Sequence, residues 1–252
     1  MDDKSAPEAS SASGEALAFR HRLGEMFANS PLPKEDLMFN LGLYVRSSLL
    51  VKFLVLNDLY LRFKSVPGVL MEFGTWWGQN LVLLENLRAI HEPFNKQRTI
   101  IGFDTFSGYP TDSDISSDST KTYAGYKTVE NYAGYLGELL EVHEGNNAFG
   151  HNRGGHKLIK GDVAQTAPGY FSDHPETIVA FAYFDIGPYE PSVAALRALR
   201  PHLLPGSVIL FDELTWVGAP GEAIAFKEVF ADVDYRIEKC ELYPSKAIVT
   251  IR

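Results

Sequence analysis

Acidic side chains end or directly follow five apolar segments of the sequence. In chain order they are Glu72, Asp104, Asp162, Asp185 and the pair Asp212-Glu213. Strands of a protein core do not need acids at their ends, whereas the carboxyl ends of parallel strands form the ligand-binding edge of an α/β sheet. We therefore expect these carboxylates to gather around one ligand site.

The stretch VLMEFGTWWGQN at residues 69–80 has the pattern of a nucleotide-binding strand, turn and helix. Its first residues predict a buried parallel strand, and the periodic segment 81–90 predicts a helix. Gly74 would let the backbone approach a ligand, and Gly78 would let the helix start close to the strand. A carboxylate within a buried strand, as at Glu72, is costly unless it meets a positive group, such as the ammonium of a cofactor. The alternative is an ordinary tight strand-to-helix turn.

Asp104 ends the second predicted strand, at residues 99–104. In a doubly wound nucleotide-binding fold, the acid at this position bonds the ribose hydroxyls. The alternative is that Asp104 caps a following helix.

Asp185, Asp212 and Glu213 end the fourth and fifth predicted strands, which we expect to be neighbours. Carboxylates this close repel one another unless they are protonated or bound to a cation. A cluster of oxygen ligands suits Mg²⁺. The alternative is that one acid caps a helix and another faces water.

The order of the predicted elements indicates an α/β protein. Helices are predicted at residues 15–28, 81–90, 191–200 and 221–231, and a long helical segment, of one or two helices, at residues 36–64. Further strands are predicted at residues 157–160, 177–185, 207–211, 235–240 and 246–251. Alternating elements predict a doubly wound, mostly parallel sheet, and the short hairpin between the last two strands requires one antiparallel strand. The predicted organisation is a disordered tail at residues 1–14, N-terminal helices at 15–66, and one domain at 67–252.

Two segments indicate functions beyond the sheet. Residues 111–155 are irregular and rich in Asp, Ser, Tyr and Gly, which predicts a lid or substrate-binding insertion. Residues 41–63 are strongly apolar at helical spacing. This segment predicts packing on the sheet, a subunit interface of a homo-oligomer, or both.

The composition limits the class of function. The chain has 252 residues with a net charge of −9 and a pI of about 5.3, which argues against general nucleic-acid binding. One cysteine, Cys240, excludes a framework of disulfides within the chain and fits a reducing cytoplasm. The sequence has neither an apolar run of transmembrane length nor the layout of a signal peptide. We expect a cytoplasmic protein that binds a small molecule.

Four motifs in order resemble those of the macrocin O-methyltransferase family, which methylates sugar hydroxyls of antibiotics. Residues 67–74 (PGVLMEFG) are similar to its P-G-x-x-x-E-x-G, and residues 103–110 (FDTFSGYP) to its F-D-S-F-E-G-L-P. Residues 185–192 (DIGPYEPS) are similar to its D-x-D-x-Y-E-x-T/S, and residues 204–213 to its L-x-P-G, strand and D-D. The resemblance covers about residues 47–230 and implies the class I methyltransferase fold, with seven strands.

The resemblance also implies roles for the acids. Glu72 would bind the amino group of S-adenosylmethionine, Asp104 its ribose and Asp162 its adenine end. Mg²⁺ would be held by Asp185, Asp212 and Glu213. The whole predicted cofactor site comprises Glu72, Gly74, Thr75, Gly78, Asp104, Thr105, Ser107, Gly161, Asp162 and Asp185.

One departure from the family pattern concerns the general base. Several relatives carry a second aspartate two residues after the first, and here that position is Gly187. Asp185, His151 and Glu190 are the predicted catalytic residues, with His156 and Asp114 as further candidates for the base.

The sequence therefore predicts an S-adenosylmethionine- and Mg²⁺-dependent O-methyltransferase that acts on a sugar in natural-product biosynthesis. A catechol-type O-methyltransferase is the nearest alternative, but its usual D-N pair is Asp212-Glu213 here. A nicotinamide-dependent oxidoreductase is disfavoured because Glu72 takes the place of the first glycine of its fingerprint. A non-catalytic member that acts only in assembly is the third alternative.

Overall fold

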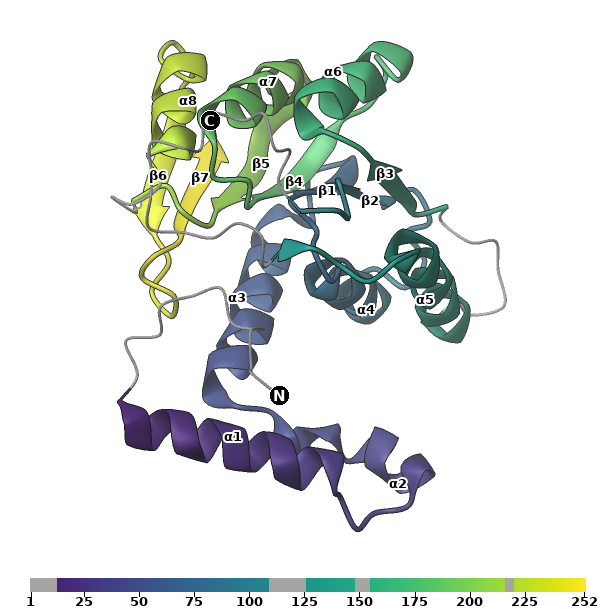
Figure 1. The fold of residues 1–252 in the computed structure, drawn as a ribbon. Coiled ribbons are helices and arrows are strands. Elements are labelled where there is room, and N and C mark those ends of the chain that lie inside the picture. Colours follow the sequence, from purple (N-terminus) through teal and green to yellow (C-terminus); the bar gives the residue numbers. More distant parts are fainter. Residues whose placement is uncertain (1–12, 109–125, 148–154, 216–219) are drawn as a thin grey trace.

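A seven-stranded sheet forms the centre of the protein, with the strand order β3-β2-β1-β4-β5-β7-β6 (Figure 1). The computed structural model describes residues 13–108, 126–147, 155–215 and 220–252. The strands are β1 (Val69–Phe73), β2 (Ile100–Asp104), β3 (Lys157–Lys160), β4 (Val179–Phe184), β5 (Leu203–Phe211), β6 (Tyr235–Lys239) and β7 (Ala247–Ile251). Strands β1 to β5 pair in parallel, and β7 runs antiparallel to both β5 and β6. The predicted sheet is therefore confirmed.

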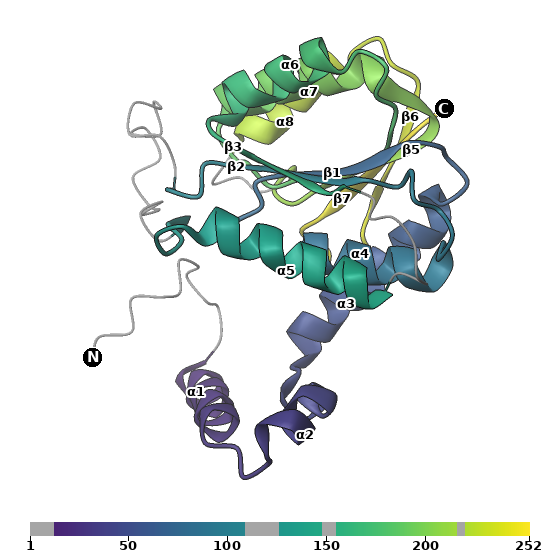
Figure 2. The same cartoon turned by 90° about the vertical axis from the view of Figure 1, so that its right-hand side faces the viewer.

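Helices cover both faces of the sheet, as a doubly wound fold requires. Helices α6 (Val163–Asp173), α7 (Tyr189–Leu199) and α8 (Gly221–Val229) lie on one face, and the 3-10 turn Arg200–His202 follows α7. Helices α3 (Ser47–Phe63), α4 (Gln79–His91) and α5 (Tyr132–Asn147) lie on the other face (Figure 2). Two apolar clusters, one on each face, share the central strands, and every residue of β4 is buried.

Two helical predictions need correction. Helix α6 was not predicted, because Pro168 and Gly169 interrupt its pattern; its signals are the N-cap Asp162 and the buried residues Val163, Ala167 and Phe171. Residues 111–155 were predicted to be irregular, but α5 is a regular helix within them, and its Leu136 and Leu140 are buried in the core. The lid function of this insertion stays a prediction, and residues 109–125 and 148–154 lie outside the described part.

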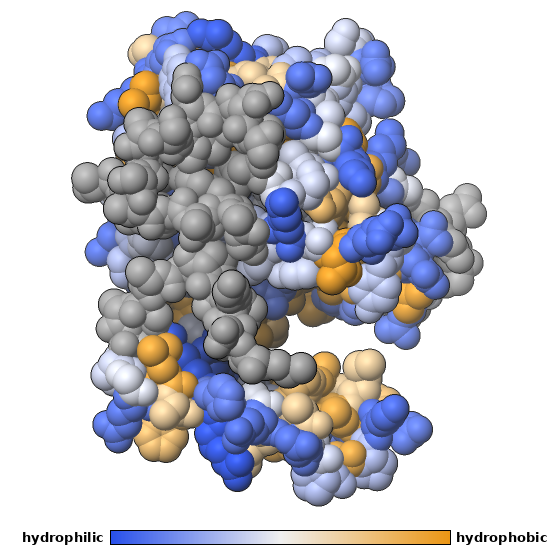
Figure 3. All heavy atoms as spheres, viewed as in Figure 1, coloured by the Kyte–Doolittle hydropathy of each residue, from blue (hydrophilic) through white to orange (hydrophobic). Residues whose placement is uncertain are grey.

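The N-terminal segment forms an arm that leaves the sheet. It consists of α1 (Gly14–Ala28), α2 (Lys34–Phe39), the 3-10 turn Leu41–Tyr44 and the first half of α3 (Figure 1). Within the described residues, α1, α2 and this turn bury no side chain. Figure 3 shows apolar residues gathered on the surface of the arm.

The predicted use of residues 41–63 as an interface is wrong for the second half of α3. Val55, Leu56, Leu59, Tyr60 and Phe63 are buried within the protomer, so they pack on the sheet. Leu43, Leu50 and Leu54 are exposed, so the interface prediction stays open for the arm itself. Among the described residues, no helix is long and apolar enough to cross a bilayer.

Arg98 joins the end of α3 to the start of β1. Its guanidinium is 2% exposed and donates to the backbone oxygens of Lys64, Val66 and Gly68. It also forms a bidentate ion pair with Glu92, which in turn accepts from the Tyr60 hydroxyl at 2.6 Å. A buried arginine whose donors are used in this way holds together segments distant in sequence.

Replacing Arg98 with methionine should lower the free energy of unfolding by about 3–5 kcal/mol, the cost of breaking a buried ion pair from one side. Arg197→Met is the matched control, because Arg197 is 64% exposed and pairs with Glu228 on the surface. Its effect should be below about 1 kcal/mol. Urea denaturation measures the free energy of unfolding of both variants. An equal loss in the two variants would show that the buried contacts of Arg98 do not stabilise the fold in this way.

Candidate functional site

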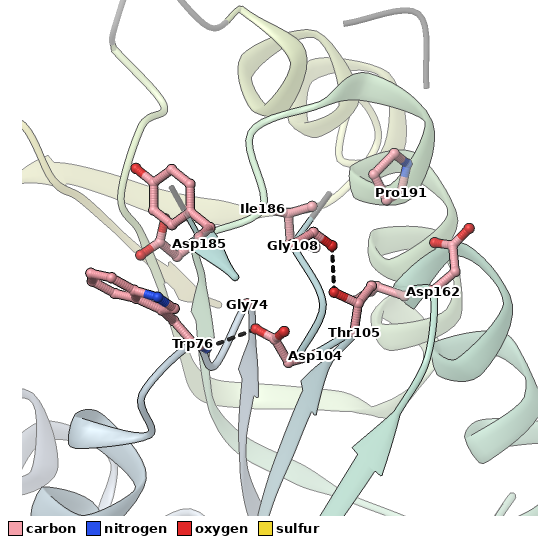
Figure 4. Close-up of a pocket in the computed structure, with 11 residues that line it drawn as sticks. Gly74, Trp76, Asp104, Thr105, Gly108, Asp162, Asp185, Ile186 and Pro191 are labelled. Carbon is pink, nitrogen blue, oxygen red and sulfur yellow. Dashed lines mark hydrogen bonds between the residues drawn. The ribbon is translucent and has the colours of Figure 1, made fainter. Parts of the chain in front are cut away.

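A cavity lies at the carboxyl ends of β1, β2 and β4 (Figure 4). The predicted acids Asp104, Asp162 and Asp185 all line it. Its other lining residues are Gly74, Trp76, Thr105, Gly108, Tyr126, Val163, Ile186 and Pro191. The structure thus brings acids from three separate turns to one cavity, as the parallel sheet predicts.

The two glycines of the β1–α4 turn are required by packing. Gly74 has φ +89°, and a Cβ there would lie 1.9 Å from the Asp185 carbonyl oxygen. Gly78 has φ +73°, and a Cβ there would lie 2.5 Å from the Leu136 methyl groups of α5. The sequence predicted that Gly74 lets the backbone approach a ligand and that Gly78 lets the helix start close to the strand. In the structure, Gly74 lets the ends of β1 and β4 meet, and Gly78 makes room for α5.

Glu72 is buried at the carboxyl end of β1. Its side chain is 1% exposed, and Oε1 accepts from Asn80 Nδ2 at 2.6 Å. Oε2 is buried without a hydrogen-bond partner among the described residues. Burial raises the pKa of Glu72 to about 8, although Asn80 and Lys52 act in the opposite direction. A cationic ligand group at Oε2 would remove this penalty, so the position fits the amino group of the predicted cofactor.

Asp104 is fixed by two backbone amides. Trp76 N donates to its Oδ2 at 2.7 Å, and Phe106 N donates to its Oδ1 at 2.6 Å. Both donor residues have left-handed backbones, with φ of 47° and 54°. Non-glycine residues adopt this region at a cost, which is typical of functional sites. Asp104 is therefore held in one orientation beside the cavity, as a ribose-binding carboxylate requires (Figure 4).

The other predicted cofactor residues are divided between the cavity and its supports. Asp162 lines the cavity and also caps α6, accepting from Ala164 N at 2.9 Å. Thr105 lines the cavity and donates to Gly108 O at 2.5 Å. Thr75 is buried and is not among the lining residues, and its hydroxyl lies 3.5 Å from Phe103 O. Ser107 is exposed and bridges to Lys127, and Gly161, with φ +145°, forms the turn before α6.

The predicted metal ligands do not form an isolated acidic cluster. Asp185 is exposed at the cavity, while Asp212 Oδ1 accepts from the Tyr183 hydroxyl at 2.5 Å and forms an ion pair with Lys246. The Lys246 ammonium is 2.8 Å from the Tyr183 hydroxyl and lies over the Tyr243 ring at 4.5 Å. A cation already neutralises Asp212, so the expected repulsion among three carboxylates does not by itself require a metal.

The fit of Mg²⁺ to these residues can be judged from the donors present. Carboxylate oxygens are suitable ligands for Mg²⁺. Across the described ranges, no group of three His, Cys, Asp or Glu side chains is arranged to hold a metal ion. The oxygen donors of Asp185, Asp212 and Glu213 are therefore of a type that suits Mg²⁺. Their arrangement does not form a metal site as it stands, because Asp212 is paired with Lys246.

The candidates for the general base lie in different places. His151 and Asp114 lie outside the described residues. His156 is a wrong prediction, because its Nδ1 accepts from Ile100 N at 3.1 Å and its Nε2 contacts Glu85 at 2.8 Å, at the amino-terminal edge of the sheet. Glu190 is exposed in the first turn of α7, just after the loop that begins at Asp185.

Sequence reasoning missed four polar or aromatic residues near the site: Trp76, Tyr183, Glu222 and Lys246. Trp76 lines the cavity, and its indole Nε1 is buried without a hydrogen-bond partner among the described residues. Glu222 and Lys246 are buried, at 0% and 5% exposure. Trp76 lies in the turn between β1 and α4, where the glycine pattern was a signal for it. Tyr183, Glu222 and Lys246 lie in or beside ordinary apolar elements, so the local pattern gave no signal for them beyond a charge in a predicted core segment.

Comparisons with known proteins identify a matching family and several relatives. Residues 59–237 match the family described as macrocin-O-methyltransferase (TylF). A protein of Streptomyces olivaceus, 8-demethyl-8-(2,3-dimethoxy-alpha-L-rhamnosyl)-tetracenomycin-C 4'-O-methyltransferase, is 25% identical over 153 residues. That match spans 59% of this chain and about half (54%) of the relative.

Solved structures extend the likeness. The calicheamicin methyltransferase CalS11 has a TM-score of 0.88 and 37% identity, over 99% of this chain and 98% of that chain. Its apo structure, described as a TDP-rhamnose 3'-O-methyltransferase, has a TM-score of 0.82 and 36% identity, over 96% of both chains. The O-methyltransferase NovP, at 15% identity and a TM-score of 0.58 over 80% of this chain and 79% of that chain, shares the fold.

Glu72→Gln should weaken binding of S-adenosylhomocysteine, which carries the same ammonium as the methyl donor, by about 1.5–3 kcal/mol, the range for a hydrogen bond to a charged group. Because the free Glu72 has a pKa of about 8, it is mostly protonated at pH 7, and binding of the ammonium should release up to one proton. Calorimetry in two buffers of different ionisation enthalpy measures this release, which the variant should lack. Glu176→Gln, at a 74% exposed position, is the control. Unchanged affinity in Glu72→Gln would remove Glu72 from the site.

Proposed function

The chain belongs to the macrocin-O-methyltransferase family of S-adenosylmethionine-dependent enzymes, and we propose that it methylates a sugar hydroxyl in natural-product biosynthesis. The observation that carries this proposal is the cavity lined by Asp104, Asp162 and Asp185, together with the buried Oε2 of Glu72, which has no hydrogen-bond partner among the described residues. The order of Glu72, Asp104 and Asp162 along the sheet edge supports the proposal, because the methyl donor would place its amine at Glu72, its ribose at Asp104 and its adenine at Asp162.

The chemistry that these residues support is positioning. The ammonium and the ribose, each held by its acid, would fix the sulfonium between them and direct its methyl group toward the exposed side of the cavity, where Asp185 lies. Methyl transfer is an in-line displacement, so a fixed distance and angle to the acceptor oxygen supply much of the rate. The acceptor hydroxyl must also lose its proton to a base, for which His151 and Glu190 remain the predicted candidates.

We propose that the acceptor is a deoxysugar of the rhamnose type carried on a nucleotide. The CalS11 structures match over nearly the whole chain, and one of them is described as a TDP-rhamnose 3'-O-methyltransferase. The Streptomyces olivaceus relative is named for a rhamnosyl glycoside, so a finished glycoside is the second candidate. A putative caffeoyl-CoA O-methyltransferase matches at 10% identity, which concerns the fold alone and gives no support to a catechol-type substrate.

We also propose Mg²⁺ as a cofactor, on the strength of the family resemblance and the oxygen donors. Asp185, Asp212 and Glu213 would hold it, and Asp212 would have to share its carboxylate with Lys246 or exchange it for the metal. When bound, Mg²⁺ would lower the pKa of a sugar hydroxyl.

Incubation with S-adenosylmethionine, Mg²⁺ and TDP-rhamnose should give a product that is heavier by one methylene, as measured by mass spectrometry. A panel of other TDP-sugars and rhamnosyl glycosides distinguishes the two candidate acceptors. Failure to methylate any sugar, while S-adenosylhomocysteine still binds, would contradict the proposed substrate class.

Exhaustive treatment with EDTA should abolish methyl transfer, and added Mg²⁺ should restore it. Binding of S-adenosylhomocysteine should persist throughout, because Glu72 and Asp104 do not belong to the predicted metal site. Full activity after chelation would refute the metal proposal and leave Lys246 as the cation beside Asp212.

We propose that the protein is a homo-oligomer whose subunits meet through the N-terminal arm. The arm exposes large apolar side chains, at Met38 (70%), Phe39 (90%) and Leu43 (64%). An isolated surface of this kind is unfavourable in water, and contact with a second copy would bury it.

Phe39→Asp should therefore convert an oligomer into a smaller species by light scattering at micromolar concentration. Phe94→Asp is the matched control. Phe94 is likewise exposed, at 79%, but it lies outside the arm, between α4 and β2. A wild-type protein that is already monomeric would contradict the proposal.

A further inference from the structure

Glu222 is a fully buried acid at the start of α8, and the proposed reaction gives it no task so far. Its side chain is 0% exposed and lies in the first turn of the helix. A buried carboxyl group without a function is costly, so the partners that compensate it indicate what it does.

The carboxyl group of Glu222 connects the ends of two strands. Oε1 accepts from the backbone amides of Ile186 and Gly187 at 2.9 and 3.1 Å. Oε2 accepts from the backbone amide of Glu213 at 3.4 Å. The first two amides belong to the loop that follows Asp185 after β4, and the third follows Asp212 after β5. One side chain therefore bridges the loop that begins at Asp185 and the loop that begins at Asp212.

The start of α8 packs directly against the loop that follows Asp185. A Cβ at Gly221 would lie 2.3 Å from Gly187 O and 2.5 Å from Tyr189 N, so the start of α8 touches the loop directly. Gly187 has φ +84°, a conformation that L side chains rarely adopt. At the position where several relatives carry an aspartate, this chain thus has a left-handed glycine whose amide is bound by Glu222.

We infer that Glu222 is a positioning residue, which holds the Asp185 loop and the Glu213 backbone in the geometry that methyl transfer requires. This inference rests on the proposed function. Glu222 is not among the residues that line the cavity, and both of its carboxyl oxygens accept from backbone amides. It therefore acts through the backbone of residues 186, 187 and 213. Displacement of a reacting group by about 1 Å costs on the order of 100-fold in rate, so loss of the bridge should appear in kcat.

Two substitutions break the bridge by independent routes. Glu222→Gln is nearly isosteric, but its amide has one acceptor oxygen, so it cannot serve both loops, and its NH₂ would meet the amide of Glu213. Gly221→Ala leaves the carboxyl group of Glu222 intact and pushes α8 away from Gly187. Each substitution should lower kcat by about 10- to 100-fold, while the affinity for S-adenosylhomocysteine stays unchanged.

Glu228→Gln is the matched control, because Glu228 is on the same helix but is 41% exposed and contacts Tyr189 and Arg197 on the surface. Its kcat should equal that of the wild type. A residue that served stability alone would lower the melting temperature of Glu222→Gln and leave kcat per folded enzyme intact. That result would overturn the inference.

Amide hydrogen exchange at Ile186, Gly187 and Glu213 tests the bridge without any enzyme activity. These amides should be protected in the wild type and in Glu228→Gln and should exchange faster in Glu222→Gln. Equal exchange in the wild type and Glu222→Gln would overturn the inference even if the enzyme is active. If no sugar is methylated but the exchange differs as expected, the proposed function fails while the bridge stands.

Discussion

Parallel pairing of β1 with β2 and β4, and of β4 with β5, is the constraint on which the site depends. It brings the ends of four strands to one edge, so that residues far apart in the sequence meet there: Glu72, Asp104, Asp185 and Asp212. The Gly74 turn lets the ends of β1 and β4 approach, and Asp185 N donates to Phe73 O at 2.9 Å beside it. Without this parallel register the acids would be scattered surface charges rather than a site.

Gathering acids at this edge carries a cost in stability. Burial raises the pKa of Glu72 and of Glu222 to about 8, above the ordinary value of 4.5. Between pH 4.5 and about 8, each of these acids is more protonated in the folded protein than in the unfolded chain. The contribution of each acid to stability therefore decreases as the pH rises through this range. The two acids therefore destabilise the free protein at neutral pH. A cationic ligand would relieve this cost at Glu72, and the backbone amides of Ile186 and Gly187 offset part of it at Glu222.

The sequence predicted the sheet well because apolar runs ending in Gly or an acid mark the parallel strands of an α/β fold. It predicted Asp104, Asp162 and Asp185 as one site for the same reason. It did not predict α6, whose Pro168 hides the helical pattern, or the partners of Asp212. Lys246 lies 34 positions beyond Asp212 in the chain and reaches it because β7 pairs with β5, a contact that no local pattern encodes. Glu222 was missed because an acid in the first turn of a helix is ordinary, and its contacts come from tertiary packing.

A crystal structure with S-adenosylhomocysteine tests the central claim, that this edge of the sheet binds the methyl donor, most directly. The account predicts that the ligand's ammonium lies within hydrogen-bonding distance of Glu72 Oε2, an atom that has no such partner among the described residues. It also predicts the ribose hydroxyls at Asp104 and the sulfur facing the exposed side of the cavity at Asp185. A ligand bound elsewhere, or one whose ammonium points away from Glu72, would contradict it.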